Sequence, residues 1–352
     1  MHYLNNLLIN AEKKSSPLLV ALLIGLLILL IAMLLTTPQF EPIYHGAVFS
    51  RMAEAPFDFT QNYALQNRIL APLIGHLIFL RGNLFVVLPL IFAALLLGTM
   101  YYFLRLKEHS PKLALLITAC FGFSALMLTP LISPGYTDTV TYFFLLLAFI
   151  YIDVSIPATA IFFSLALLNH EQSAFLLPAI FCYARYLKKN WVTAFIYLFL
   201  SLIPAIIYRT WISTETSPEY SVDFYLSNQN LEACMASWNK IPLGIFFSFK
   251  LLWIFPFWAM AVSIQKKEFL FTATLLAGLL FPLLQYVIAY DITRMYLICF
   301  PLVLLSILYL LKLKTTKQIV PFILVVFIVN LLIPFAMMAR EGLFFFYPFW
   351  IS

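Results

Sequence analysis

The stretch Leu18–Leu35, LLVALLIGLLILLIAMLL, decides the class of this protein. Its eighteen residues carry no charge, and that length is enough for one helix to cross the hydrocarbon core of a bilayer. Similar apolar runs recur up to the C-terminus without a long polar stretch between them. The chain is 63% hydrophobic and 10% charged, with a mean hydropathy of +0.97, outside the soluble range. Residues 1–352 are therefore expected to form a single integral membrane domain with no appended soluble domain.

The apolar runs predict an all-α, polytopic transmembrane helical bundle with about eleven spans. We expect these spans near 17–35, 84–104, 113–130, 138–152, 155–169, 172–187, 191–208, 241–263, 269–290, 294–311 and 320–338. The first run is too long for the apolar core of a signal peptide, and no small-residue cleavage pattern follows it. The N-terminal run is therefore expected to remain as the first span.

Basic residues in the turns between these spans predict the orientation. With the N-terminus in the cytoplasm, 13 of the 21 basic residues fall in short cytoplasmic turns, as the positive-inside rule requires. They are Lys13, Lys14, Arg105, Lys107, Lys112, Arg185, Lys188, Lys189, Lys266, Lys267, Lys312, Lys314 and Lys317. Eleven of the 15 acids fall on the other side. We expect a bacterial inner membrane protein with a functional extracytoplasmic face, and the net charge of +6 gives no reason to expect a nucleic-acid partner.

Two long extracytoplasmic loops, 36–83 and 209–240, interrupt the otherwise short connections. Long loops in compact membrane domains are usually functional or disordered. The first contains Asn67–Leu80, in which Arg68, Pro72 and Gly75 share one helical face with His76 at its edge. This pattern predicts a helix at the membrane surface or re-entering it, with Arg68 directed at the headgroup layer. An ordinary interfacial helix with a snorkelling arginine fits equally well.

Acidic and histidine side chains at the outer helix ends are the catalytic candidates. Glu41, His45 and Asp58 lie in the first loop, and a carboxylate held above the bilayer can act as a general base. For each of them a solvated loop residue is the simpler interpretation. Asp138 opens the fourth span, where a base, a metal ligand and a helix N-cap are equally good interpretations.

The triplet Asn169-His170-Glu171 occupies the turn between the fifth and sixth spans. Ionisable groups at this depth are costly unless they are buried against partners. His170 and Glu171 are therefore candidates for proton transfer or metal binding, and the alternative is a polar turn that caps two helices.

Cationic side chains near the same face are candidates for binding phosphate. Arg294 lies three residues after Asp291 on one helix face and in a first turn, where it opposes the helix dipole. The alternative there is an aspartate N-cap with a local ion pair. Lys250 lies about six residues inside its span, and either snorkels or joins Arg68, Arg209 and Arg294 in a basic pocket at headgroup depth. Arginine suits phosphate because its planar fork binds two oxygens at once.

The outer-face motifs resemble those of the GT-C superfamily of integral membrane glycosyltransferases. The resemblance rests on Tyr44-His45-Gly46 with Phe49 and Ala53, and on Asn67-Arg68-Ile69-Leu70-Ala71-Pro72-Leu73. It extends to Asp138, to His170-Glu171, and to Asp291 with Arg294, within residues 41–301.

The resemblance implies transfer of a sugar from a polyprenyl-phosphate donor to a glycan or lipid acceptor on the extracytoplasmic face. Arg68 and Arg294 would hold the donor phosphate, and a first-loop carboxylate would act as base. This chain has His45 where such sequences often have Asp. The base candidates are therefore Glu41, Asp58, Asp138 and Glu171, with the last two ranked first. Some members use a divalent metal, so Mg²⁺ or Mn²⁺ held by Asp138, Glu171 and His170 is an expectation.

Other classes remain open from the sequence. A flippase or transporter of lipid-linked sugars would need a water-accessible path through the span middles. A polysaccharide polymerase or ligase would share this topology, and the missing first-loop Asp fits a non-catalytic assembly subunit. The nearly uncharged span middles favour chemistry on a lipid-borne substrate, because transporters usually place their polar site near the midplane.

Overall fold

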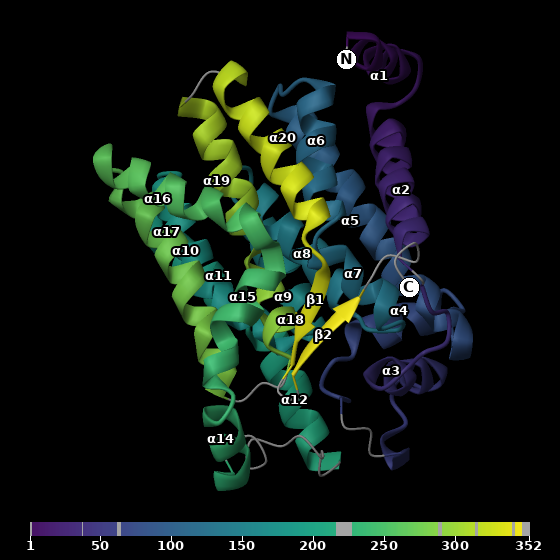
Figure 1. Ribbon diagram of the computed structural model, residues 1–352. Coiled ribbons are helices and arrows are strands. Elements are labelled where there is room, and N and C mark those ends of the chain that lie inside the picture. The colour runs from purple at the N-terminus through teal and green to yellow at the C-terminus, as the bar shows by residue number, and fades with distance from the viewer. Residues whose placement is uncertain are drawn as a thin grey trace.

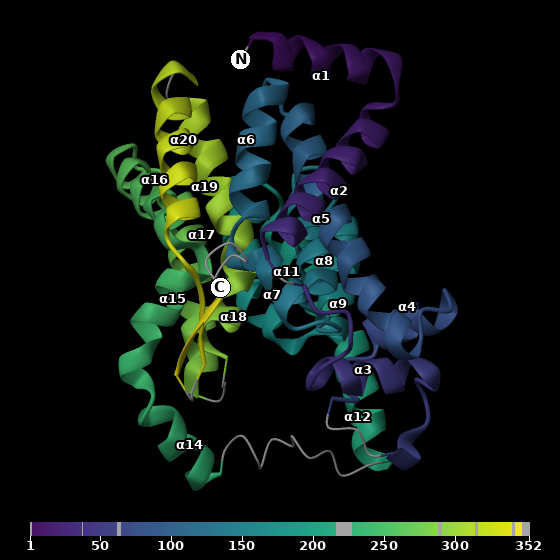
Figure 2. The same cartoon turned by 45° about the vertical axis from the view of Figure 1, so that its right-hand side comes forward.

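The computed structural model describes residues 2–36, 38–61, 65–215, 227–287, 291–313, 316–339 and 342–346. It is a bundle of helices (Figure 1). The helices α1, α6 and α20 reach one end of the bundle, and α3, α12 and α14 lie at the opposite end. The same separation is clear in the rotated view of Figure 2.

The first third of the chain forms two helices, a compact outer segment and a long return helix. Its elements are α1 (His2–Lys14), α2 (Pro17–Leu35), α3 (His45–Glu54), the 3-10 helix η1 (Phe59–Gln61), α4 (Leu70–Leu77), η2 (Gly82–Val86) and α5 (Val87–Leu106). The helices α2 and α5 pack closely because small residues face each other, as is common between membrane helices. A Cβ on Gly25 would lie 2.3 Å from the carbonyl oxygen of Ala94.

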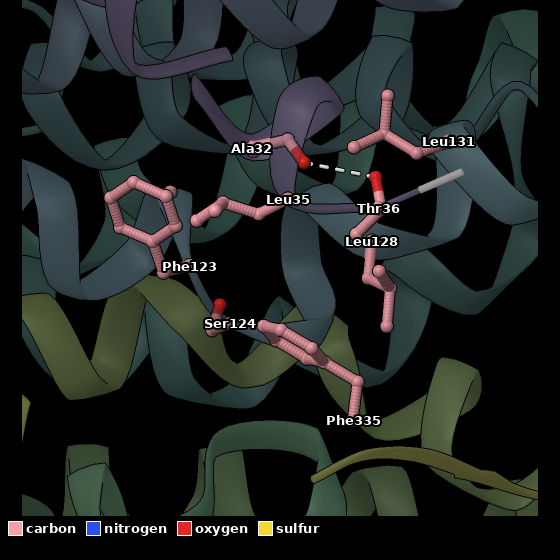
Figure 3. Close-up of a pocket in the computed structure, with 9 residues that line it drawn as sticks. Ala32, Leu35, Thr36, Phe123, Ser124, Leu128, Leu131 and Phe335 are labelled. Carbon is pink, nitrogen blue, oxygen red and sulfur yellow. Dashed lines mark hydrogen bonds between the residues drawn. The ribbon is translucent and has the colours of Figure 1, made fainter. Parts of the chain in front are cut away.

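The middle of the chain consists of shorter helices joined by tight turns. These are α6 (Pro111–Gly122), α7 (Ala125–Ile132), α8 (Asp138–Tyr151), α9 (Ile156–Asn169), η3 (Glu171–Leu176), α10 (Leu177–Tyr186), α11 (Trp191–Leu200) and α12 (Ile203–Glu215). The helices α6 and α7 meet at a bend of 49°. Figure 3 shows a small apolar pocket at this bend, where Phe123 and Ser124 meet Leu35 and Phe335. No candidate site residue lines that pocket.

The last third contains several breaks within helical segments. Its elements are α14 (Asn228–Met235), η4 (Trp238–Lys240), α15 (Ile241–Phe249), η5 (Lys250–Trp253), α16 (Ile254–Gln265), α17 (Phe269–Leu280), η6 (Phe281–Val287), α18 (Ile292–Tyr296), η7 (Leu297–Cys299), α19 (Phe300–Leu313), α20 (Thr316–Leu332), and the strands β1 (Phe335–Met338) and β2 (Leu343–Phe346). The two strands form an antiparallel hairpin, with Phe335 opposite Phe346.

The helix predicted to run to residue 338 ends at Leu332 instead. Pro334 follows, and the residue before a proline is disfavoured in the α conformation. The ammonium of Lys250 donates hydrogen bonds to the carbonyl oxygens of Asn330 (3.0 Å) and Ile333 (2.7 Å). These bonds satisfy carbonyls that the end of a helix leaves without partners.

Six helical segments within the described residues are long and apolar enough to cross a membrane, or seven if the bent pair α6–α7 is one span. The protein is therefore a multi-pass, predominantly helical membrane protein. Three further apolar helices, Asp138–Tyr151, Ile156–Asn169 and Gln318–Leu332, are shorter. The total of eleven spans stays a prediction, because a helix of 14 residues covers about 21 Å of a core about 30 Å thick.

Side chains from several predicted cytoplasmic turns pair with one another at the α1 end of the bundle. Arg105 contacts Glu12 at 2.6 Å, and Lys107 contacts Asp153 at 3.1 Å. Lys189 donates to the carbonyl oxygen of Asp153 at 2.6 Å. Turns far apart in sequence thus meet at one end, away from α3 and α14 (Figure 2).

Candidate functional site

Two buried arginines organise the polar residues near the α3 end of the bundle. The first, Arg294 on α18, is 3% exposed. Its Nε lies 3.1 Å from a carboxylate oxygen of Asp138, the first residue of α8, and its Nη1 contacts the carboxylate of Asp291. The guanidinium also lies over the ring of Tyr136, with Cζ 4.7 Å from the ring centroid. The N-cap of α8 is Thr137 rather than Asp138, and the carboxylate of Asp138 pairs with Arg294.

The second arginine, Arg68, precedes α4 and holds Glu171 with both sides of its fork. Its Nε donates to Oε2 of Glu171 at 3.0 Å, and its Nη2 donates to Oε1 at 2.6 Å. Arg209 on α12 adds a bond of 3.1 Å to the same Oε2. Arg68 is only 6% exposed. Its guanidinium is therefore held inside the bundle by the partly exposed carboxylate of Glu171, and its orientation toward the headgroup layer stays a prediction.

Asn169, the last residue of α9, joins the two groups. Its side-chain oxygen accepts from the backbone nitrogen of Ala71 at 3.1 Å, just after Arg68 in the chain. Its amide nitrogen donates to the carbonyl oxygen of Thr137 at 2.8 Å and to the hydroxyl of Thr141 at 2.7 Å. One fully buried side chain therefore sets the position of the chain beside Arg68 against the start of α8.

His45, the first residue of α3, lies beside both arginine groups. Its ring contacts that of Tyr136 with centroids 5.5 Å apart. Burial, together with the positive charges of Arg294 and Arg68, lowers the pKa of His45 to about 4. The imidazole is therefore neutral at neutral pH and can accept a proton. Burial also raises the pKa of Tyr136 to about 12, so its phenol stays protonated.

Glycine makes the approach of α3 to this site geometrically feasible. A Cβ on Gly46 would lie 2.1 Å from the carbonyl oxygen of Pro134 and 3.0 Å from the Cα of Gly135. Gly135 itself has a φ of +87°, a conformation that favours glycine. The two glycines let the start of α3 touch the connection between α7 and α8, and this contact brings His45 to Tyr136.

A hydrogen bond fixes the start of α8 against α5. The hydroxyl of Thr139, next to Asp138, donates to the carbonyl oxygen of Pro89 at 2.8 Å. Pro89 lies inside the candidate span Gly82–Leu106, so the Asp138 carboxylate lies beside that span.

The two arginine groups differ in charge and accessibility. Arg68, Arg209 and Glu171 together carry +1, since two cations share one carboxylate. Asp138, Asp291 and Arg294 carry −1, since two carboxylates share one cation. The side chains of Glu171, Asp291 and Arg209 are 31%, 28% and 37% exposed, whereas that of Asp138 is 2% exposed. A ligand can therefore reach Glu171, Asp291 and Arg209 but not Asp138.

Other predicted site residues lie outside these groups or have different partners. Glu41 is exposed, and Asp58 accepts bonds from the backbone nitrogen (3.0 Å) and hydroxyl (2.5 Å) of Thr60 in a local turn. Lys250 is 3% exposed and its ammonium is 4.2 Å from the ring centroid of Phe335. That ammonium also holds the end of α20, so its present contacts are structural. His170 is 2% exposed, and its Nδ1 lies 3.6 Å from Glu171.

The expected divalent metal finds no fitting set of ligands in the described part of the chain. No group of three or more His, Cys, Asp or Glu side chains gathers there in a way that could hold a metal ion. Asp138 and Glu171 are each neutralised by arginine instead. Paired in this way, the two carboxylates are poorly suited to bind a divalent cation.

Prediction from sequence passed over two contributors to this site. Asp291 was interpreted only as a partner of Arg294, and Tyr136 was assigned no role. The three-residue spacing of Asp291 and Arg294 was the available signal for the first. The contact of Tyr136 with Arg294 joins residues that are far apart in the sequence, and no periodic pattern in the sequence predicts it.

No family model matches this chain, and the searches of curated proteins and of solved structures find no match either.

Proposed function

We propose that this protein is a membrane glycosyltransferase of the GT-C type that takes a sugar from a polyprenyl-phosphate donor. The observation that carries the proposal is a group of net charge +1 beside one of net charge −1, recessed at one end of a membrane bundle. A phosphate donor and a hydroxyl acceptor need two things at such a site: positive charge that attracts the anion, and an accessible carboxylate that removes the proton.

Arg68 and Arg209 are the proposed ligands of the donor phosphate. Both guanidinium groups converge on Glu171, and Arg209 keeps an exposed edge through which a phosphate can approach. Arginine forks bind phosphate oxygens in pairs. The buried Arg294 supplies positive charge nearby while it orients Asp291.

The proposed base is one of the two accessible carboxylates, Asp291 or Glu171, and the neutral His45 lies near both groups. The base takes the proton from an acceptor hydroxyl, and the hydroxyl oxygen then forms a bond to the anomeric carbon. The bond from that carbon to the phosphate oxygen breaks, and polyprenyl phosphate leaves with the electron pair. Arginine charge stabilises this leaving group, as preorganised donors do for developing anions.

The active face follows from the same proposal. The site includes the start of α3, and α3 lies toward the end opposite α1 (Figure 2); the lysine- and arginine-rich turns near α1 belong to the cytoplasm by the positive-inside rule. The reaction would then run on the extracytoplasmic face, in a bacterial inner membrane.

The test is transfer from a panel of radiolabelled polyprenyl-phosphate sugars by purified protein in lipid nanodiscs. We expect product from the wild type and about a hundredfold slower turnover in Arg68→Ala, the scale of losing one transition-state donor. Arg51→Ala is the matched control, because Arg51 is exposed on α3 outside the two groups. No product from any donor, or full activity in Arg68→Ala, would refute the proposal.

Further variants then identify the base. Asp291→Asn and Glu171→Gln remove the accessible carboxylates one at a time, and the base is the one whose loss abolishes transfer without weakening donor binding. Asp138→Asn is not diagnostic, because it disturbs Arg294 and hence Asp291.

A further inference from the structure

A set of uncharged polar side chains is buried without partners next to Glu171. Gln172 and Ser173 lie on η3, and Gln285 lies on η6. Gln172 and Gln285 are each 2% exposed and Ser173 is fully buried. Within the described residues, the side-chain amide oxygen and nitrogen of both glutamines have no hydrogen-bond partner, and the hydroxyl of Ser173 has none either. Such groups are costly to bury unpaired, so several of them indicate a ligand.

The packing of irregular helices brings together the elements that carry these side chains. The 3-10 helix η3 packs directly against η6 and η7. Tyr142 on α8 and His170 before η3 each carry a buried polar atom without a partner, the hydroxyl and Nε2 respectively. Irregular backbone at membrane depth is tolerated where it is enclosed by protein or lines a cavity.

The break between α17 and η6 has an identifiable cause. Pro282 lacks the N–H that would bond the carbonyl of Gly278, and the thiol of Cys299 donates to that carbonyl at 3.3 Å instead. The hydroxyl of Tyr296 donates to the next carbonyl, that of Leu279. These backbone groups are thus satisfied from η7 and α18, whereas the amide of Gln285 is not.

The chemistry of the unpaired groups selects a class of ligand. An amide both donates and accepts hydrogen bonds, and so does a hydroxyl. Gln172, Ser173 and Gln285 carry no charge, so they would not neutralise the charge of a phosphate or a cation bound among them. A ring of hydroxyl groups, each a donor and an acceptor, matches them. Because Gln172 follows Glu171 directly, such a ring would adjoin the arginine group.

We propose that Gln172, Ser173 and Gln285 form a subsite for the hydroxyl groups of the transferred sugar. This inference rests on the proposed function for the identity of the donor, but a hydroxyl-binding subsite can be tested without it. A file of water molecules is the competing occupant of the same groups.

The first measurement compares two probes in nanodiscs: a polyprenyl phosphate without sugar, and the same lipid phosphate carrying a hexose. In Gln172→Leu we expect affinity for the hexose lipid to fall about tenfold, the scale of losing hydrogen bonds in a buried site. Affinity for the lipid phosphate alone should stay at the wild-type level. Gln265→Leu is the control, because Gln265 is exposed at the far end of α16. Equal loss for both probes, or no loss for either, would overturn the subsite.

The second measurement separates this inference from the proposed function. Ser173→Cys is treated with a water-soluble thiol reagent, alone and with free hexoses, against wild type as baseline. Slower modification in the presence of a hexose supports the subsite even if neither lipid probe binds. That combination of results would refute the proposed glycosyltransferase function but not the subsite. Modification unaffected by any hexose points to water, and no modification points to a dry interior. Either of these results would overturn the subsite.

Discussion

At the scale of single residues, burial divides the three site carboxylates into two roles. Asp138 is 2% exposed and forms an ion pair with Arg294, whereas the side chains of Asp291 and Glu171 are partly accessible. Removing one partner of a buried ion pair is strongly destabilising, because the other charge is left uncompensated. Loss of activity in a variant of Asp138 would therefore report on the position of Arg294 rather than on proton transfer.

The lowered pKa of His45 predicts a pH dependence of stability. Its pKa is about 4 in the folded protein and 6.5 without the surroundings, so the unfolded chain takes up the proton first as pH falls. The contribution of neutral His45 to the stability of the folded protein is complete above pH 6.5. It is lost as the pH falls from 6.5 to about 4. We expect the thermal unfolding temperature of wild type to fall over that window relative to His45→Gln. Parallel curves for the two proteins would contradict this.

Lys250 offers a test between its sequence-based and its structural role. Its ammonium donates to the carbonyls of Asn330 and Ile333, and a hydrogen bond to a charged group contributes about 1.5–3 kcal/mol. Lys250→Met should lower thermal stability but leave the affinity for polyprenyl phosphate unchanged. Lys240→Met serves as the control. Weaker phosphate binding in Lys250→Met at normal thermal stability would support the role of Lys250 in the donor site that the sequence predicts.

At the scale of elements, the decisive contact joins the start of α3 to the connection before α8. Gly46 and Gly135 touch backbone to backbone, and residues on either side of this contact, His45 and Tyr136, meet ring to ring. An outer segment that looks like a loop in sequence is therefore a packed part of the site. Buried Phe49 and Met52 on α3 reinforce this packing against the bundle.

Gly46→Ala tests that contact. The new methyl group would meet the carbonyl oxygen of Pro134 at 2.1 Å, and overpacking of this kind costs about 1–3 kcal/mol. We expect reduced thermal stability together with reduced transfer, because α3 must shift and carry His45 with it. Arg51→Ala is the control on the same helix, since the side chain of Arg51 is exposed. Wild-type behaviour of Gly46→Ala would show that the contact is not required.

At the scale of the whole molecule, the polar groups separate into two ends with different chemistry. One end carries basic turns that pair with Glu12 and Asp153, and the other carries the paired arginine groups of the candidate site. Between them the spans are almost uncharged, apart from Lys250. A lipid-borne substrate suits this arrangement, because its charged head can reach one end while its tail stays in the bilayer.

The orientation predicts which thiols a membrane-impermeant reagent can reach in intact cells. Ser110 lies exposed at the α6 end, and Asn83 lies exposed at the opposite end of α5. Asn83→Cys should react from outside and Ser110→Cys only after permeabilisation. Wild type provides the baseline, because its cysteines are buried or half-buried. The reverse pattern would invert the topology and refute an extracytoplasmic site.

The sequence by itself determined the class of this protein and the starts of several helices, such as α2, α8 and α17. Long apolar runs can bury their backbone polar groups in a bilayer only as helices, and Pro and Ser mark starts such as that of α6. Candidate residues such as Arg68, Asp138, Glu171 and Arg294 stood out because charges are rare in such a chain. Only the tertiary structure decided which of them meet. It paired Arg68 with Glu171 across 103 residues and Arg294 with Asp138 across 156, and it turned Lys250 toward the end of α20. Such pairings depend on how helices pack, and no local periodicity records them.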